Sequence, residues 1–136
     1  MIFNEYYGKF FDKDKNFNTY GYERKLELII SPRCNLGCKY CYIHRFRNQI
    51  FNEDCFNDEK TITNLKLICD WMYKNKWNPS IDIFSGELFG QEIGFKVMDT
   101  LYDYYNSVDE DMRPETISIP TNFTFICSEE TTDRVR

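Results

Sequence analysis

Three cysteines stand close together in the chain, at Cys34, Cys38 and Cys41, in the pattern C-x3-C-x2-C. Thiolates this close on one loop can converge on a single metal centre, and Gly37 gives the backbone the freedom to wrap around it. Three thiolates on a 4Fe-4S cluster would leave one iron without a protein ligand, and catalysis at a metal requires such an open coordination position. The spacing therefore indicates metal chemistry.

The same spacing leaves a second interpretation open. His44 extends the pattern to C-x3-C-x2-C-x2-H, and three cysteines with one histidine form a common structural zinc site. The other cysteines, Cys55, Cys69 and Cys127, are assigned no ligand role. Cys69 lies on the apolar face of a predicted helix and Cys127 in an apolar run, where a free cysteine behaves as a small hydrophobic residue, whereas Cys55 lies in a polar segment.

The composition excludes several classes of protein. A chain of 136 residues fits one domain and rules out a multidomain enzyme. The 17 Lys and Arg against 22 Asp and Glu argue against a nucleic-acid partner held by phosphate contacts. No apolar run approaches the ~20 residues of a membrane span, and the first residues lack the apolar segment of a signal peptide. We therefore expect a cytoplasmic protein, with no nucleic-acid and no membrane partner, in which a count of six cysteines points to metal binding or chemistry.

Short apolar strands alternate with amphipathic helices after residue 24. Strands are predicted at 26–30, 81–84 and 116–119. Apolar residues recur at three- and four-residue spacing in two predicted helices: Ile62, Leu65, Ile68, Cys69 and Met72, then Ile93, Val97, Leu101 and Tyr105. Asn57 or Asp58 is the expected N-cap of the first helix, and Ser128 that of a third. The alternation predicts βαβ units with a parallel sheet.

The cysteine segment resembles the signature of the radical S-adenosylmethionine superfamily, C-x3-C-x-aromatic-C in the loop after the first strand, with Tyr40 at the aromatic position. The resemblance covers most of the chain from Lys25 onward. It implies that Cys34, Cys38 and Cys41 hold a 4Fe-4S cluster, that S-adenosylmethionine binds the fourth iron, and that Tyr40 lies against the adenine. It also implies a one-electron reductant of the flavodoxin or ferredoxin type and a 5′-deoxyadenosyl radical that abstracts hydrogen from substrate.

Two further segments are similar to features of that family. Ser85-Gly86-Glu87 matches the Gly-Gly-Glu that binds the amino group of S-adenosylmethionine, although Ser85 would be strained if its position needs a positive φ. Thr121-Asn122 matches a Thr-Asn found after the third strand in peptide-modifying members. Ser85, Gly86, Glu87 and Asn122 are thus implied cofactor-binding residues. All these segments follow predicted strands, where βα barrels build their active sites, and a zinc site has no reason to show that placement.

The implied fold is an α/β partial (βα) barrel of the radical S-adenosylmethionine type, truncated after about three strand-helix units. Residues 1–24 form an extension and residues 25–136 the truncated core. The implied function is reductive cleavage of S-adenosylmethionine and hydrogen abstraction from an unknown substrate, for which peptides are the class indicated, with a C-terminal half supplied in trans. The alternative is a non-catalytic fragment that binds a cluster or zinc as an interaction module.

The cysteine segment is also a basic island in an acidic chain. No acidic residue occurs between Glu27 and Glu53, whereas Arg33, Lys39, Arg45 and Arg47 do. Nearby cations lower thiolate pKa values and would favour cluster retention. A solvated helix face after Cys41 explains Arg45 and Arg47 equally well.

Polar residues interrupt the three predicted strands at similar positions: Glu27, Asp82 and Ser118. Parallel strands covered on both faces are normally apolar throughout. Because helices must cover the outer face, we predict that these side chains point away from the helices, into the lumen of the barrel. Edge exposure in a loosely closed sheet is the alternative.

Overall fold

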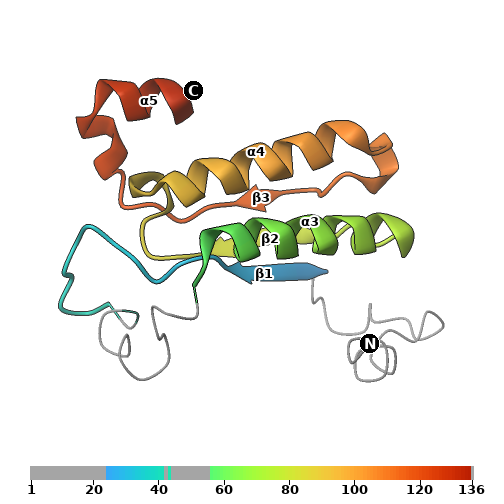
Figure 1. Cartoon of the computed structure of the whole chain (residues 1–136), viewed down its shortest axis with the longest axis horizontal. Coiled ribbons are helices and arrows are strands. Elements are labelled where there is room, and N and C mark those ends of the chain that lie inside the picture. Colours follow the sequence, from blue (N-terminus) through green and yellow to red (C-terminus); the bar gives the residue numbers. More distant parts are fainter. Residues whose placement is uncertain (1–23, 42, 44–55, 136) are drawn as a thin grey trace.

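The computed structural model describes residues 24–41, 43 and 56–135. Within them one parallel sheet has the strand order β1-β2-β3, formed by Lys25–Ile29, Ser80–Phe84 and Ile117–Ser118. Helix α3 (Asp58–Lys74) precedes β2, α4 (Glu92–Ser107) joins β2 to β3, and α5 (Glu129–Val135) follows β3 (Figure 1). Short 3-10 helices lie at Leu88–Gly90, Glu110–Met112 and Thr124–Cys127. The α/β class and the parallel sheet expected from the sequence are confirmed.

Helix α3 begins where its capping chemistry predicts. The side chain of Asn57 accepts a hydrogen bond from the backbone N–H of Lys60 at 3.0 Å, and Asp58 and Glu59 occupy the first turn, where negative charge is favourable. The buried residues of the helix are Leu65, Cys69 and Met72. Burial and the neighbouring Asp70 raise the pKa of the Cys69 thiol to about 11. Cys69 is 5% exposed, so the expectation that it packs as a small hydrophobic residue is confirmed.

Helix α4 buries one apolar stripe, which ends differently from the prediction. Ile93, Val97 and Leu101 are buried as expected, but Tyr104 at 8% exposure completes the stripe, and Tyr105 at 36% does not. A helix turns 100° per residue, so after two steps of four residues the buried face is regained by a step of three. Tyr105 instead lies beneath the guanidinium of Arg113, 5.0 Å from its ring centre.

One face of the sheet and both long helices form the core, with α3 packed against α4. Leu28 and Ile30 from the β1 segment and Ile81 and Ile83 from β2 are buried in this core. Since strand side chains alternate between faces, the residues between them lie on the opposite face. No helix of the described residues is long and apolar enough to cross a membrane.

Glu27, Asp82 and Ser118 form one row across the opposite face of the sheet. Glu27 is the register partner of Asp82, and Asp82 is the register partner of Ser118. Their neighbours along the strands belong to the core on the helix side, so these three side chains lie away from the helices, and their place in the lumen of a barrel stays a prediction. Lys25, on the same face, lies 3.6 Å from the carboxylate of Asp82.

The segment after β3 differs in part from the expectation. Ser128 caps α5, accepting a hydrogen bond from the backbone N–H of Thr131 at 3.3 Å. Cys127, however, is exposed at the end of a 3-10 helix, so the expectation that it packs as a small hydrophobic residue is wrong.

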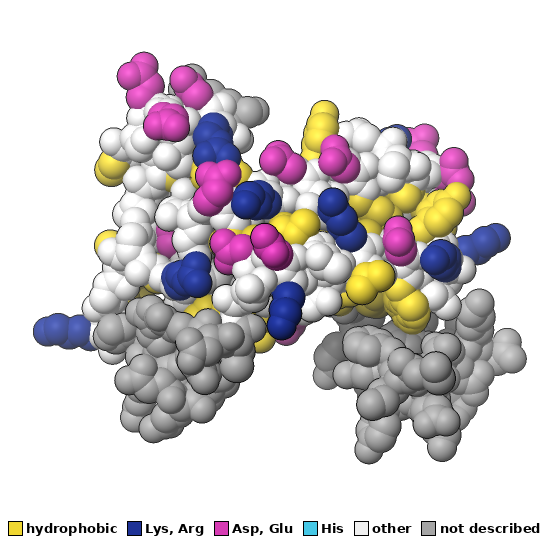
Figure 2. All heavy atoms as spheres, viewed as in Figure 1, with side chains coloured by type: hydrophobic (Ala, Val, Ile, Leu, Met, Phe, Trp, Pro, Cys, Tyr) yellow, Lys and Arg dark blue, Asp and Glu magenta, His cyan; other side chains and the backbone are white. Residues whose placement is uncertain are grey.

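Acidic and basic side chains are interspersed on the face drawn in Figure 2, without a continuous basic surface.

Candidate functional site

The segments that carry the candidate residues meet at the carboxyl ends of the strands. The chain leaves β1 into the cysteine loop (31–41), leaves β2 into Ser85–Glu87, and leaves β3 into 119–123, and hydrogen bonds join all three. Parallel strands make this possible because their carboxyl ends lie at the same edge of a sheet. His44, Arg45, Arg47 and Cys55 lie outside the described residues.

The first two loops run side by side. The carbonyl of Ser31 accepts hydrogen bonds from the Ser85 hydroxyl at 2.7 Å and the Gly86 N–H at 2.8 Å, and the Glu87 N–H donates to the carbonyl of Arg33 at 2.9 Å. A Cβ at Gly86 would collide with the backbone carbonyl of Arg33, so only glycine fits this close approach. Ser85 is not among the described non-glycine residues with positive φ, and its hydroxyl joins the loops without strain.

Gln91 joins the same two loops, although nothing in the sequence pointed to it. Its side-chain oxygen accepts a hydrogen bond from the Ser31 hydroxyl at 2.8 Å. Its side-chain nitrogen donates to the carbonyls of Arg33 at 2.9 Å and Glu87 at 2.7 Å. A single amide at the start of α4 therefore fixes the path of the chain just before Cys34.

Glu87 is completely buried, with 0% exposure. Its Oε1 accepts hydrogen bonds from the Phe89 N–H at 3.1 Å and the Thr121 hydroxyl at 2.9 Å, and its Oε2 accepts one from the Asn122 N–H at 2.7 Å. A buried carboxylate is tolerated when such donors replace water. The structure thus places Glu87 as a tie between the loops after β2 and β3, and its role as the partner of an amino group stays a prediction.

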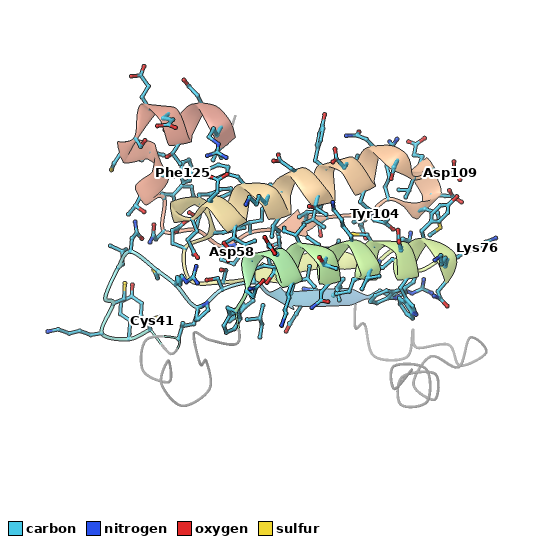
Figure 3. The ribbon with its side chains drawn as sticks, viewed as in Figure 1. Cys41, Asp58, Lys76, Tyr104, Asp109 and Phe125 are labelled. Carbon is cyan, nitrogen blue, oxygen red and sulfur yellow. The ribbon has the colours of Figure 1, made fainter. Side chains whose placement is uncertain are left out.

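The three cysteines of the motif lie on one loop at the surface. Cys34 is exposed, and Cys38 and Cys41 are half-buried; all are free thiols. The Cys41 N–H donates to the carbonyl of Cys38 at 3.0 Å, forming a tight turn. Figure 3 shows Cys41 on the part of the loop that extends beyond the ends of α3 and α4.

These thiols are not gathered around one point. Among the described residues no group of three or more His, Cys, Asp or Glu side chains is placed to hold a metal ion. The donor set nevertheless suits an iron-sulfur cluster, which three thiolates on a short loop can hold. A Cβ at Gly37 would meet no atom within 4 Å, so there is open space at this point of the loop. Cluster binding would therefore require closure of the loop around the iron.

Tyr40 projects into solvent beside the thiols, with 91% exposure. Interaction with the side chain of Cys38, and more weakly with that of Cys41, raises the pKa of the Tyr40 hydroxyl. The ring of Tyr40 is thus open to solvent, on the same loop as the cysteines.

Asn122 connects the third loop to the cysteine loop through a closed ring of side-chain hydrogen bonds. Its Nδ2 donates to Oδ1 of Asn35 at 3.0 Å, Nδ2 of Asn35 donates to the hydroxyl of Thr124 at 2.7 Å, and this hydroxyl donates to Oδ1 of Asn122 at 2.6 Å. Asn122 Nδ2 also lies 3.8 Å from Sγ of Cys34. Sequence reasoning missed Asn35 and Thr124; the signal available was that polar residues follow strand ends.

The basic island is only partly described. Arg33 forms an ion pair with Asp58 at 3.8 Å, and both side chains are about half exposed. An exposed pair of this kind contributes little to stability. Asp58, at the start of α3, thus partly neutralises the charge of Arg33, which directly precedes Cys34 in the chain.

Comparisons with family models, with curated proteins and with solved structures find no match to this chain.

Proposed function

We propose that this chain is a 4Fe-4S protein of the radical S-adenosylmethionine type, with Cys34, Cys38 and Cys41 as the cluster ligands and the sheet as part of a (βα) barrel. When bound, the cluster would pass one electron to S-adenosylmethionine, giving methionine and a 5′-deoxyadenosyl radical that abstracts hydrogen from substrate. The substrate class indicated by the motif is a peptide, and the electron donor would be a flavodoxin or ferredoxin.

One observation carries the proposal. The cysteine loop, the Ser85–Glu87 segment and Asn122 follow three adjacent parallel strands and are hydrogen-bonded to one another at one edge of the sheet. Active sites of βα folds are assembled at this edge, from loops that follow different strands. A structural zinc site needs only its own ligands and gives no reason for these connections.

The other residues have roles that follow from their surroundings. The exposed ring of Tyr40 beside Cys38 offers a face on which an adenine can stack. Gly86 keeps the backbone of the second loop against the cysteine loop. The row of Glu27, Asp82 and Ser118 would face the lumen of the barrel, where a substrate would lie.

The test is anaerobic reconstitution of the full chain with iron and sulfide, followed by incubation with S-adenosylmethionine and dithionite. The proposal expects about four iron atoms per chain, as in one 4Fe-4S cluster, and 5′-deoxyadenosine formation. Cys34→Ala should abolish both, whereas Cys127→Ala, which removes an exposed free cysteine outside the motif, should change neither. A cluster without 5′-deoxyadenosine would favour the non-catalytic alternative, and tight zinc uptake without a cluster would refute the proposal.

A further inference from the structure

The geometry points to Asn122 as a positioning residue for Cys34: its side-chain amide donates a hydrogen bond to the sulfur, and the buried carboxylate of Glu87 holds it in place. The inference rests on the proposed function, in which Cys34 is a cluster ligand. It gives Glu87 a role within the protein, different from the amino-group contact that the resemblance implies.

Asn122 is hydrogen-bonded to Glu87 through its backbone. The backbone N–H of Asn122 and the hydroxyl of Thr121 both donate to the Glu87 carboxylate, at 2.7 and 2.9 Å. Bonds from neutral donors to an ionised carboxylate are stronger than bonds between neutral groups, and this carboxylate has no contact with water to replace them. The backbone at the start of the third loop is therefore fixed relative to the second loop.

The second step is the orientation of the Asn122 amide. Its Oδ1 accepts hydrogen bonds from the backbone N–H of Thr124 at 2.9 Å and from the Thr124 hydroxyl at 2.6 Å. The amide nitrogen must then face the cysteine loop, where Oδ1 of Asn35 lies at 3.0 Å. The opposite orientation would place two oxygens against each other, so the hydrogen-bond pattern determines which atom is the nitrogen.

The third step is the contact with sulfur. An amide nitrogen carries two hydrogens, and one of them is used by Asn35. The other is available to Cys34, whose Sγ lies at 3.8 Å and also accepts the backbone N–H of Leu36 at 3.4 Å. Cys34 thus has donors both from its own loop and from the loop after β3.

The turn at Phe123 shows that this arrangement is held by its surroundings. Phe123 has a φ of 61°, in the left-handed region that bulky residues seldom adopt. Its N–H donates to the Thr121 hydroxyl at 3.1 Å, the same group that contacts Glu87. The hydrogen bonds of Thr121 and Asn122 thus support a backbone conformation that would otherwise relax.

Donors to a cluster thiolate have a definite effect. They stabilise the reduced state, which carries the extra negative charge, and so raise the midpoint potential. Removing the Asn122 donor should therefore make the cluster harder to reduce without removing any ligand.

The experiment compares the reconstituted wild type with Asn122→Ala, Asn122→Asp and the control Asn106→Ala, whose amide donates within α4 to the carbonyl of Tyr102. Asn122→Ala should retain the iron but show a tenfold lower ratio of reduced to oxidised cluster at a fixed potential. For one electron this corresponds to a midpoint potential lower by about 59 mV. Asn122→Asp has a side chain of the same shape with an oxygen in place of the donor nitrogen, and it should lower the midpoint potential further. Asn106→Ala should match the wild type. Equal potentials for Asn122→Asp and the wild type would overturn the inference.

A second measurement uses the metal-free full chain and separates this inference from the proposed function. Amide hydrogen exchange at Leu36 and Thr124 should accelerate in Asn122→Ala and in Glu87→Gln, because each variant weakens the hydrogen bonds that link the loops. Unchanged exchange in both variants would refute the link. If the wild type binds no cluster but exchange is faster in both variants, the proposed function is refuted. The positioning of Cys34 by Asn122 is then still supported.

Discussion

The carboxylate of Glu87 accepts the backbone N–H of Asn122 at 2.7 Å, across 35 positions of sequence. This bond joins the loops after two neighbouring strands. Because the acceptor is completely buried, no water can take the place of the donor. The loops at the carboxyl edge of the sheet are thus held by a charged group in the interior.

Replacing Glu87 should therefore be costly. Glu87→Ala would leave the donors of Phe89, Thr121 and Asn122 without an acceptor, and we expect a loss of about 3–5 kcal/mol of unfolding free energy. Glu87→Gln keeps one acceptor oxygen and should lose about 1–3 kcal/mol. Urea denaturation measures both, with exposed Glu115→Gln as the control, for which we expect a change within about 0.5 kcal/mol. Equal stability of Glu87→Ala and the wild type would show that the hydrogen bonds of the buried Glu87 carboxylate do not stabilise the fold.

Two glycines provide a matched pair of substitutions. Gly86→Ala would drive a methyl group into the backbone carbonyl of Arg33 and should cost about 1–3 kcal/mol by overpacking. Gly37→Ala meets no atom within 4 Å and needs no unusual φ, so it should be neutral or stabilising by up to about 1 kcal/mol. Thermal denaturation of the two variants measures both changes in stability. An equal change in both variants would show that the two loops do not approach as described.

The two faces of the sheet should respond differently to substitution. Leu28 is in the core, and Leu28→Ala should cost about 2–4 kcal/mol through lost burial and a cavity. Its neighbour Glu27 lies on the opposite face, and Glu27→Gln should stay within about 0.5 kcal/mol. Urea denaturation tests the pair. A large loss for Glu27→Gln would place that side chain in the core and reverse the assignment of faces.

Stability should depend on pH through Glu92. The guanidinium of Arg134 hydrogen-bonds the Glu92 carboxylate at 3.1 Å and lies 3.6 Å from the Phe95 ring centre, so it connects α5 to α4. This contact holds the pKa of Glu92 below its ordinary value of 4.5. A lowered pKa stabilises the fold above the ordinary value, and this stabilisation is lost as the pH falls through the lower, folded-state value.

The measurement is the denaturation midpoint of the wild type against Glu92→Gln, which has no charge to lose. The wild type should be the more stable at about pH 7, and the difference should narrow towards about pH 3 as Glu92 takes up its proton. Glu115→Gln serves as the control and should show no comparable difference. A gap for Glu92→Gln that is equally wide at both pH values would show that the ion pair with Arg134 is not its cause.

The sequence by itself determined much of the local structure. The caps at Asn57 and Ser128 are made by side chains that reach backbone N–H groups three positions ahead. The apolar stripes of α3 and α4 follow from helical spacing, and the polar row of Glu27, Asp82 and Ser118 follows from the alternation of strand side chains. The error at Tyr105 arose because a spacing of four drifts from the 3.6-residue turn.

The site depended on tertiary structure. The cysteine motif and the Glu87 and Asn122 segments could be placed at strand ends, but the burial of Glu87 and the amides of Gln91 and Asn35 could not be foreseen. Asn122 meets Asn35 across 87 positions and Glu87 across 35. Whether a polar side chain binds a ligand or ties two loops depends on which donors the fold brings within about 3 Å, and that distance is decided by strand order and packing, not by spacing along the chain.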